Sequence, residues 1–216
     1  MRGLFITFEG PEGSGKSTQA RWLAEFLEQQ GFAVVLTREP GGTPIGDQIR
    51  QILLNRTNHA MHARTEVLLF QASRAQHVEE LICPALKAGK IVICDRYADS
   101  TLAYQGYGRG EDVDELRRLI EYATGGLWPD LTLWLDLPVE TGLARIAPDR
   151  RNRLDAEALA FHRKVHEGYA RLAAKEPHRW VRVAADRSRE DVRAAVRAAV
   201  MARLEQPMPP LAAGCA

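Results

Sequence analysis

Short apolar runs alternate with longer amphipathic segments along most of the chain. Five runs have the length and apolar content of buried strands, and they are Leu4–Phe8, Ala33–Thr37, Ile91–Cys94, Leu131–Leu137 and Trp180–Val183. The segments between and after them carry apolar residues at helical spacing, and they are Lys16–Gln30, Ile45–Asn55, Thr65–Ala88, Val113–Ala123, Val139–Ile146, Glu157–Lys175 and Arg189–Leu204. This alternation predicts an α/β fold, with a parallel sheet covered by helices on both faces.

Breaks in the pattern indicate the domain organisation. No internal repeat occurs, and the biased segment Gln206–Ala216 predicts a single domain over residues 1–206 with a flexible tail at 207–216. Pro84 is expected to kink the third helix or to mark its last turns. The basic stretch Ala147–Ala156 separates two helices, and on its own it is compatible with a solvated loop.

A glycine-rich turn follows the first apolar run and has the spacing GxxxxGK[ST], from Gly10 to Ser17. Unpaired N–H groups at the start of the next helix can converge on phosphate, Lys16 can approach the β/γ-phosphates, and Ser17 can bind Mg²⁺. Strand, turn and helix together predict a phosphate-binding loop (P-loop). Its predicted nucleotide-binding residues are Gly10, Pro11, Glu12, Gly13, Ser14, Gly15, Lys16, Ser17 and Thr18.

Composition narrows the class of protein. The 216 residues are 45% hydrophobic and 26% charged, with a net charge of +1, so the global charge gives no case for nucleic acid or a membrane surface. Apolar stretches are too short for a membrane span or a secretory signal. Cys83, Cys94 and Cys215 lack metal-ligand spacing, and we expect reduced thiols in a cytoplasmic protein, with Cys94 in the core and Cys215 exposed in the tail.

A second candidate site follows the third apolar run, where Asp95 and Arg96 stand at the carboxyl end of the strand. Ligands of open parallel sheets bind at that edge. In a P-loop protein, Asp95 can hold Mg²⁺ or its waters, and Arg96 can hold phosphate oxygens. Arg38 follows the second run at the same edge and is a candidate phosphate clamp, although an ordinary solvated loop is the alternative.

Two further patterns suggest a pocket for a planar base. Phe70 and Arg74 are four residues apart in a predicted helix and therefore share a face, although on the pattern alone a buried Phe beside a surface Arg is the commoner arrangement. Polar pairs at the same spacing follow Asp95 and Arg96, and they are Ser100 with Tyr104 and Thr101 with Gln105. An exposed helix would explain these pairs without any ligand.

These signals together resemble the bacterial-type thymidylate kinases, within the nucleoside monophosphate kinases. The matching segments are GPEGSGKST at 10–18, REPGGT at 38–43, FQASRAQ at 70–76, DRYADSTLAYQGYGRG at 95–110 and WLDLPVETGLAR at 134–145. The resemblance implies a P-loop NTPase fold with a five-stranded parallel sheet, flanking helices and a mobile lid at about 147–156. It also implies Mg²⁺-dependent phosphoryl transfer from ATP to dTMP, giving dTDP and ADP in dTTP synthesis, by a homodimer.

The resemblance also implies residue roles. Lys16 and Ser17 serve the ATP phosphates and the metal, with Asp95 as a second metal ligand. The expected dTMP-binding residues are Arg38, Phe70, Arg74, Arg96, Ser100, Thr101, Tyr104 and Gln105. Phe70 is expected to stack on thymine and Tyr104 to lie against the deoxyribose. The expected catalytic residues are Lys16, Arg96, Glu12, Arg153 and Arg151, and Glu12 is expected to accompany a lid arginine.

The lid departs from the family pattern, because Leu154-Asp155 runs into Ala156-Glu157 without the usual arginine after the aspartate. We therefore expect Arg153 or Arg151 to reach the γ-phosphate. Adenine contacts are assigned only by position, to residues 184–187 after the last strand. Three alternatives remain open from the sequence: a nucleotide sensor without catalysis, a GTPase, which the lack of an NKxD sequence disfavours, and a kinase with another acceptor.

Overall fold

The computed structural model describes every residue except 1, 148, 150, 151, 208, 209 and 216. Its parallel strands pair in the order β2-β3-β1-β4-β5. The strands are β1 (Phe5–Glu9), β2 (Val34–Arg38), β3 (Ile91–Asp95), β4 (Leu131–Asp136) and β5 (Trp180–Ala184). The predicted five-stranded parallel sheet is confirmed, with strand ends that differ from the predicted ones by about one residue.

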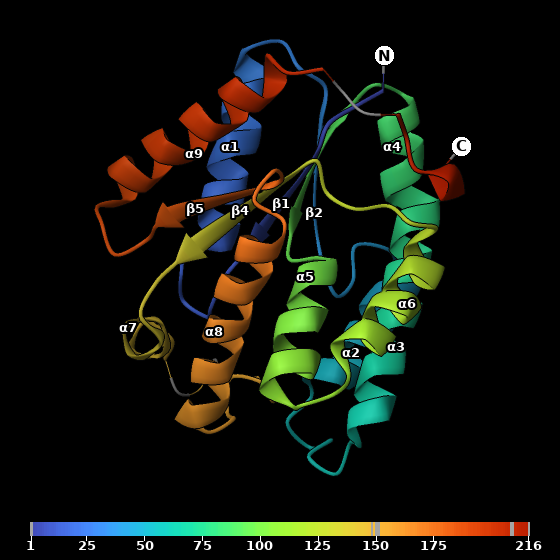
Figure 1. Cartoon of the computed structure of the whole chain (residues 1–216), viewed down its shortest axis with the longest axis vertical. Coiled ribbons are helices and arrows are strands. Elements are labelled where there is room, and N and C mark those ends of the chain that lie inside the picture. Colours follow the sequence, from blue (N-terminus) through green and yellow to red (C-terminus); the bar gives the residue numbers. More distant parts are fainter. Residues whose placement is uncertain (1, 148, 150–151, 208–209, 216) are drawn as a thin grey trace.

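Helices cover both faces of this sheet (Figure 1). One face packs against α1 (Lys16–Gln29) and α9 (Arg189–Leu204) through an apolar core that includes Ile6 and Phe8. The core on the opposite face includes residues of α3 (Ala63–His77), α4 (Cys83–Lys87), α5 (Ala98–Thr101), α6 (Val113–Thr124) and α8 (Leu159–Lys175). Next to these helices, α2 (Pro44–Leu54) packs against α3, and α7 (Val139–Ala144) packs against α8. Because strand side chains alternate, Phe5 and Glu9 point to this second side, where Tyr169 of α8 meets Glu9.

Two π-helical turns occur in the described part of the chain, and the first lies inside a segment predicted as one helix. The segment predicted as one helix consists of α3, the π turn η1 (Val78–Ile82) and α4, with Pro84 in the first turn of α4. Proline has no N–H to donate, so a wider turn before it relieves the helix. A second π turn, η2 (Leu102–Gly108), continues α5. Such turns often occur at functional sites, and this one carries Tyr104 and Gln105.

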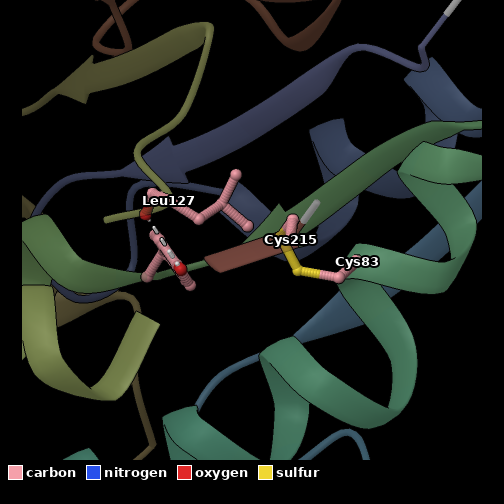
Figure 2. The surroundings of a disulfide bond; sticks show 4 residues. Cys83, Leu127 and Cys215 are labelled. Carbon is pink, nitrogen blue, oxygen red and sulfur yellow. Dashed lines mark hydrogen bonds between the residues drawn. A yellow bond between two sulfur atoms is a disulfide. The ribbon is translucent and has the colours of Figure 1, made fainter. Parts of the chain in front are cut away.

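The C-terminal tail returns to the body of the domain. Leu211 and Ala212 pack against the core, and η4 (Ala213–Cys215) ends in a disulfide between Cys215 and Cys83, whose Cα atoms are 5.3 Å apart (Figure 2). The prediction of a reduced, exposed Cys215 was therefore wrong. The two cysteines are 132 residues apart, and no local pattern reports such a contact. Cys94 is a buried free thiol, as expected.

None of the helices in the described part of the chain combines the length and apolarity that a membrane span requires.

Candidate active site

A cavity of about 820 Å³ lies at the carboxyl edge of the sheet, where loops after parallel strands meet. Most residues singled out from the sequence line it. They are Glu12, Gly13, Ser14, Gly15, Lys16, Ser17, Thr18, Arg38, Phe70, Arg74, Asp95, Arg96, Ser100, Thr101, Tyr104 and Gln105. The fold thus brings the phosphate loop, the strand-end charges and the base-pocket candidates to one place.

The phosphate loop depends on glycines that adopt left-handed backbone angles. Gly13 and Gly15 have φ values of 70° and 92°, and a Cβ at Gly13 would overlap the carbonyl oxygen of Gly142. The ammonium of Lys16 donates to the carbonyl oxygens of Pro11, at 2.7 Å, and Gly10, at 3.1 Å. Burial, and next the charge of Arg96, lower the pKa of Lys16 to about 8. The loop therefore holds its cation inside the turn.

Ser17 and Asp95 form a pair of oxygen donors beside the loop. The Ser17 hydroxyl donates to the Asp95 carboxylate, and both residues line the cavity. Hydroxyl and carboxylate oxygens are the ligands that Mg²⁺ prefers. Since the described residues contain no group of three or more His, Cys, Asp and Glu placed to hold a metal, a cation here would take its other ligands from phosphate and water. The pair fits a nucleotide-bound Mg²⁺.

Arg96 occupies the centre of the cavity wall. Its backbone has φ 69°, a left-handed conformation that is costly for a residue with a side chain and that occurs at functional sites. Its Nη2 donates to Glu12 at 2.7 Å and to the Tyr104 hydroxyl at 3.1 Å. Burial opposes ionisation of Glu12, but Arg96 and Lys16 outweigh it and lower the pKa of Glu12 to about 2. Glu12 is therefore an ionised partner of Arg96.

Behind Arg96 lies a buried carboxylate that the sequence did not single out. Arg96 Nη1 donates to the hydroxyls of Ser100 and Tyr169, each at 3.2 Å, and both hydroxyls donate to Glu9, at 2.6 and 2.9 Å. Burial, and next the charge of Asp99, raise the pKa of Glu9 to about 7. The alternation of side chains along β1 could have revealed Glu9, because Glu9 points away from the aliphatic core between the sheet and α1.

Arg74 is buried rather than exposed, so the alternative of a surface arginine beside Phe70 is excluded. Its guanidinium donates to Glu39 at 2.9 Å, to Gln71 at 3.0 Å and to Thr101 at 3.1 Å. A fourth hydrogen bond goes to a backbone carbonyl oxygen. These partners fix the guanidinium plane in the cavity wall near Phe70.

Gln105, on η2, completes this part of the wall. Its side chain is buried, and its Nε2 donates to Glu66 of α3 at 2.8 Å. The Ser100–Tyr104 and Thr101–Gln105 pairs therefore face the cavity, and the exposed helix that would have explained them is excluded.

Comparison with known proteins agrees with this geometry. Residues 8–196 match the family described as Thymidylate kinase. A thymidylate kinase of Geotalea uraniireducens is 51% identical over 94% of this chain and 99% of its own, and one of Halothermothrix orenii is 54% identical over 89% and 93%. The chain belongs to the thymidylate kinase family. The crystal structure of thymidylate kinase from Ehrlichia chaffeensis, 34% identical, superposes with a TM-score of 0.75 over 93% of this chain and 99% of that one.

Of the two lid arginines expected to reach the γ-phosphate, only Arg153 is among the described residues, and it is hydrogen-bonded away from the cavity. The guanidinium of Arg153 binds Glu66 and the carbonyl oxygen of Leu53, and Arg153 does not line the cavity. Arg151 lies outside the described residues. Arg145, which the sequence reasoning missed, lines the cavity and donates to the carbonyl oxygen of Gly13 at 3.2 Å. In this arrangement Arg145 is nearer to the phosphate loop than Arg153.

The remaining residues of the cavity include some that were predicted and some that the sequence did not indicate. Arg38 lines the cavity but is also paired with Asp47 at 3.1 Å on an exposed surface. The segment proposed for adenine contributes two residues to the lining, Ala185 and Arg187. The missed lining residues include Arg50, Leu54, Asn152, Leu154, Arg189 and Val192. Asn152 and Leu154 lie in the predicted lid, and the others belong to no motif, so only the folded chain shows that these side chains reach the site.

Proposed function

We propose that this chain transfers the γ-phosphoryl group of ATP to dTMP, giving dTDP and ADP, as a step in dTTP synthesis. One observation supports this most: a phosphate loop with Lys16 and Ser17 shares one cavity with Arg96 and with a pocket that contains Phe70 and Arg74. A donor phosphate site, an acceptor phosphate site and a base site are the parts that this reaction requires.

The acceptor half of the cavity binds dTMP. Arg96 and Arg38 hold its phosphate, because a guanidinium offers a planar fork of donors to phosphate oxygens. Phe70 stacks on thymine, while Arg74 and Gln105 hydrogen-bond to its edge. Ser100 and Thr101 line the same wall, and Tyr104 lies against the deoxyribose, where its ring leaves little room for a 2′-hydroxyl. Glu12, an unusual residue inside a phosphate loop, orients Arg96 and Tyr104 through hydrogen bonds.

The donor half binds ATP through the backbone of residues 10–18. Lys16 balances charge on the β/γ-phosphates. Ser17 and Asp95 hold Mg²⁺, which when bound neutralises charge on the donor phosphates. Ala185 and Arg187, together with Arg189, are our candidates for contacts with adenine, because they line the same cavity as the phosphate loop.

Catalysis comes from positive charge near the transferring phosphoryl group and from the alignment of its donor and acceptor. The second pKa of a phosphomonoester is about 6, so dTMP is mainly a dianion at neutral pH and needs no strong general base. The obstacle is repulsion between two anions, which Lys16 and Arg96 reduce. The lid at about 147–156 adds charge from Arg153 once this residue leaves Glu66, and Arg145 adds it from the neighbouring helix end. Arg151 keeps its predicted role as a further lid cation.

The alternative functions differ in what they predict for ADP release and for the role of Arg96. A nucleotide sensor would bind ATP without releasing ADP in the presence of dTMP. A kinase for an unphosphorylated nucleoside would have no need of Arg96 in the acceptor half. A homodimer and a cytoplasmic location are also part of this proposal, although the disulfide removes the cysteine argument for that location.

A coupled assay of ADP formation tests the proposal across dTMP, dUMP, dCMP, dGMP and thymidine in the presence of Mg·ATP. We expect the highest kcat/KM with dTMP and negligible turnover with thymidine, which lacks the acceptor phosphate. An enzyme that forms no ADP with dTMP, or that prefers thymidine, would refute the proposal.

A further inference from the structure

We propose that Glu66 is a positioning residue that sets base specificity by fixing the orientation of the Gln105 side-chain amide. The inference rests on the proposed function, because it concerns the base of the acceptor nucleotide. Glu66 lies on α3, is 1% exposed and does not line the cavity, so it acts through Gln105, which does.

Four hydrogen bonds converge on the Glu66 carboxylate. Its Oε1 accepts from Gln105 Nε2 at 2.8 Å and from Arg109 Nε at 2.7 Å. Its Oε2 accepts from Arg109 Nη2 at 3.1 Å and from Arg153. Burial opposes ionisation of this carboxyl, but the hydrogen bonds from Arg109, Gln105 and Arg153 outweigh it and hold its pKa below the ordinary value. The group is therefore an ionised, purely accepting partner.

An ionised carboxylate leaves Gln105 one orientation. The two arginines can only donate, so the carboxylate has no reason to gain a proton, and the amide of Gln105 must present its NH₂ group to Glu66. The carbonyl Oε1 of Gln105 then points to the other side of the amide, as a hydrogen-bond acceptor for a ligand in the cavity that Gln105 lines. The wall thus offers one acceptor, near Arg74, whose four hydrogen bonds within the protein leave one N–H on Nη2 for a ligand.

This pattern matches thymine and uracil and opposes cytosine. Thymine and uracil carry an N3–H donor beside the O4 acceptor, whereas cytosine carries an N3 acceptor beside an N4 amino donor. With the amide fixed, cytosine would set N3 against the Gln105 carbonyl and its amino group against the Arg74 guanidinium. Unpaired buried polar groups of this kind are costly. Glu66 therefore prevents the rotation of Gln105 that would accommodate N3 of cytosine, and the mismatch at Arg74 remains in either orientation.

The variant Glu66→Gln removes this constraint with little change in volume. Of the four donors, the three from Arg109 and Arg153 cannot turn into acceptors, and two of them face the Oε2 position. The carbonyl of the introduced amide is best placed there, with its NH₂ group toward Gln105. Gln105 can then rotate to accept from it and present NH₂ to the cavity, which favours the N3 acceptor of cytosine.

The experiment compares kcat/KM for dTMP, dUMP and dCMP in the wild-type protein and in Glu66→Gln. We expect the dTMP:dCMP ratio to fall by roughly tenfold or more, which one misplaced hydrogen bond produces, while the dTMP:dUMP ratio stays unchanged because both bases share this edge. Glu157→Gln is the matched control: Glu157 accepts from Arg109 at 2.9 Å, so the control perturbs the same arginine and should leave both ratios unchanged.

Equal losses with all three nucleotides, or an unchanged dTMP:dCMP ratio in Glu66→Gln, would overturn the inference. If Glu66→Gln does not fold, Gln105→Met keeps the ion pairs of Glu66 and must lower the same ratio, and an unchanged ratio there would also overturn it. Glu66→Asp, which retains an accepting carboxylate, should restore the ratio relative to Glu66→Gln. A wild-type protein that does not phosphorylate dTMP would instead refute the proposed function.

Discussion

The cavity wall, residues 96–105, and the predicted lid, residues 147–156, each contain an arginine that the structure describes, and Arg96 and Arg153 are held in different ways. Arg96 stands at the end of β3, inside the cavity, with its guanidinium fixed by Glu12, Tyr104 and hydroxyls behind it. Arg153 is also hydrogen-bonded, but to Glu66 and to the carbonyl oxygen of Leu53, and it does not line the cavity. Arg96 is therefore held inside the cavity in advance, whereas Arg153 would have to leave Glu66 to reach it.

The largest expected effect belongs to the wall. Arg96→Ala should lower kcat/KM for dTMP by about 10³-fold, because it removes a preorganised phosphate donor and leaves Glu12 without its cation. Steady-state kinetics with dTMP varied at saturating ATP measure this. A loss of less than tenfold would mean that the wall does not hold the acceptor phosphate.

The next effects concern Arg153 of the lid and Arg145 beside it, and they should change kcat more than KM for dTMP. Arg145→Ala and Arg153→Ala should each lower kcat by roughly 10²-fold, since each removes charge from the transferring group, with KM for dTMP changed by less than about threefold. Single-turnover measurements separate this from product release. An unchanged kcat in either variant would remove that arginine from the chemistry.

Arg153→Ala and Arg145→Ala should differ in their free energy of unfolding. Arg153→Ala should lower the free energy of unfolding by about 2 kcal/mol, because Glu66 is buried and loses one of its cations. Arg145 is paired only to a backbone carbonyl on the surface among the contacts described, so Arg145→Ala should change it by less than about 0.5 kcal/mol. Urea denaturation of both variants measures the difference. Equal free energies of unfolding for the two variants would show that the Arg153–Glu66 ion pair does not stabilise the fold.

The smallest effect concerns pH and the carboxylate behind Arg96. The pKa of Glu9 is raised from 4.5 to about 7, so the folded protein binds this proton more tightly than the unfolded chain. The stability from protonated Glu9 is present below pH 4.5 and is lost as the pH rises through about 7. Activity should change in the opposite direction, because ionised Glu9 is a stronger acceptor for Ser100 and Tyr169, the two hydroxyls that hold Arg96 Nη1.

We therefore expect kcat/KM for dTMP to rise through about pH 7, while the free energy of unfolding falls. The phosphate of dTMP also ionises, with a second pKa of about 6, and this adds a separate rise to the pH profile of kcat/KM in every variant. Glu9→Gln should lack the Glu9 component in both profiles. Identical pH profiles for the wild-type protein and Glu9→Gln would show that this carboxylate does not control Arg96.

Much of the wall could be predicted from the sequence, because its residues follow local rules. Apolar runs locate the strands, the glycine spacing locates the phosphate loop, and strand ends place Arg38, Asp95 and Arg96 at one edge. The structure bears out this placement. Their roles in binding and catalysis stay predictions that the experiments above test.

The missed residues depend on contacts between distant segments. Glu66 meets Gln105 and Arg153 across 39 and 87 residues of chain, and Cys83 meets Cys215 across 132. A pattern within one segment cannot report such pairs. Arg153 shows the same limit, because its charge was evident in the sequence, whereas its carboxylate partner was not. Arg145 stood within a matching motif, but nothing in that motif indicated that its side chain reaches Gly13.

The most direct test of the preorganised wall is equilibrium binding of dTMP and of thymidine to the wild-type protein and to Arg96→Ala, by calorimetry without ATP. The two ligands differ only in the phosphate. We predict that the wild-type protein binds dTMP at least about 10²-fold more tightly than thymidine, as charge-assisted hydrogen bonds to Arg96 require, and that Arg96→Ala loses most of this difference while thymidine affinity is unchanged. A dTMP preference that survives in Arg96→Ala would contradict the account.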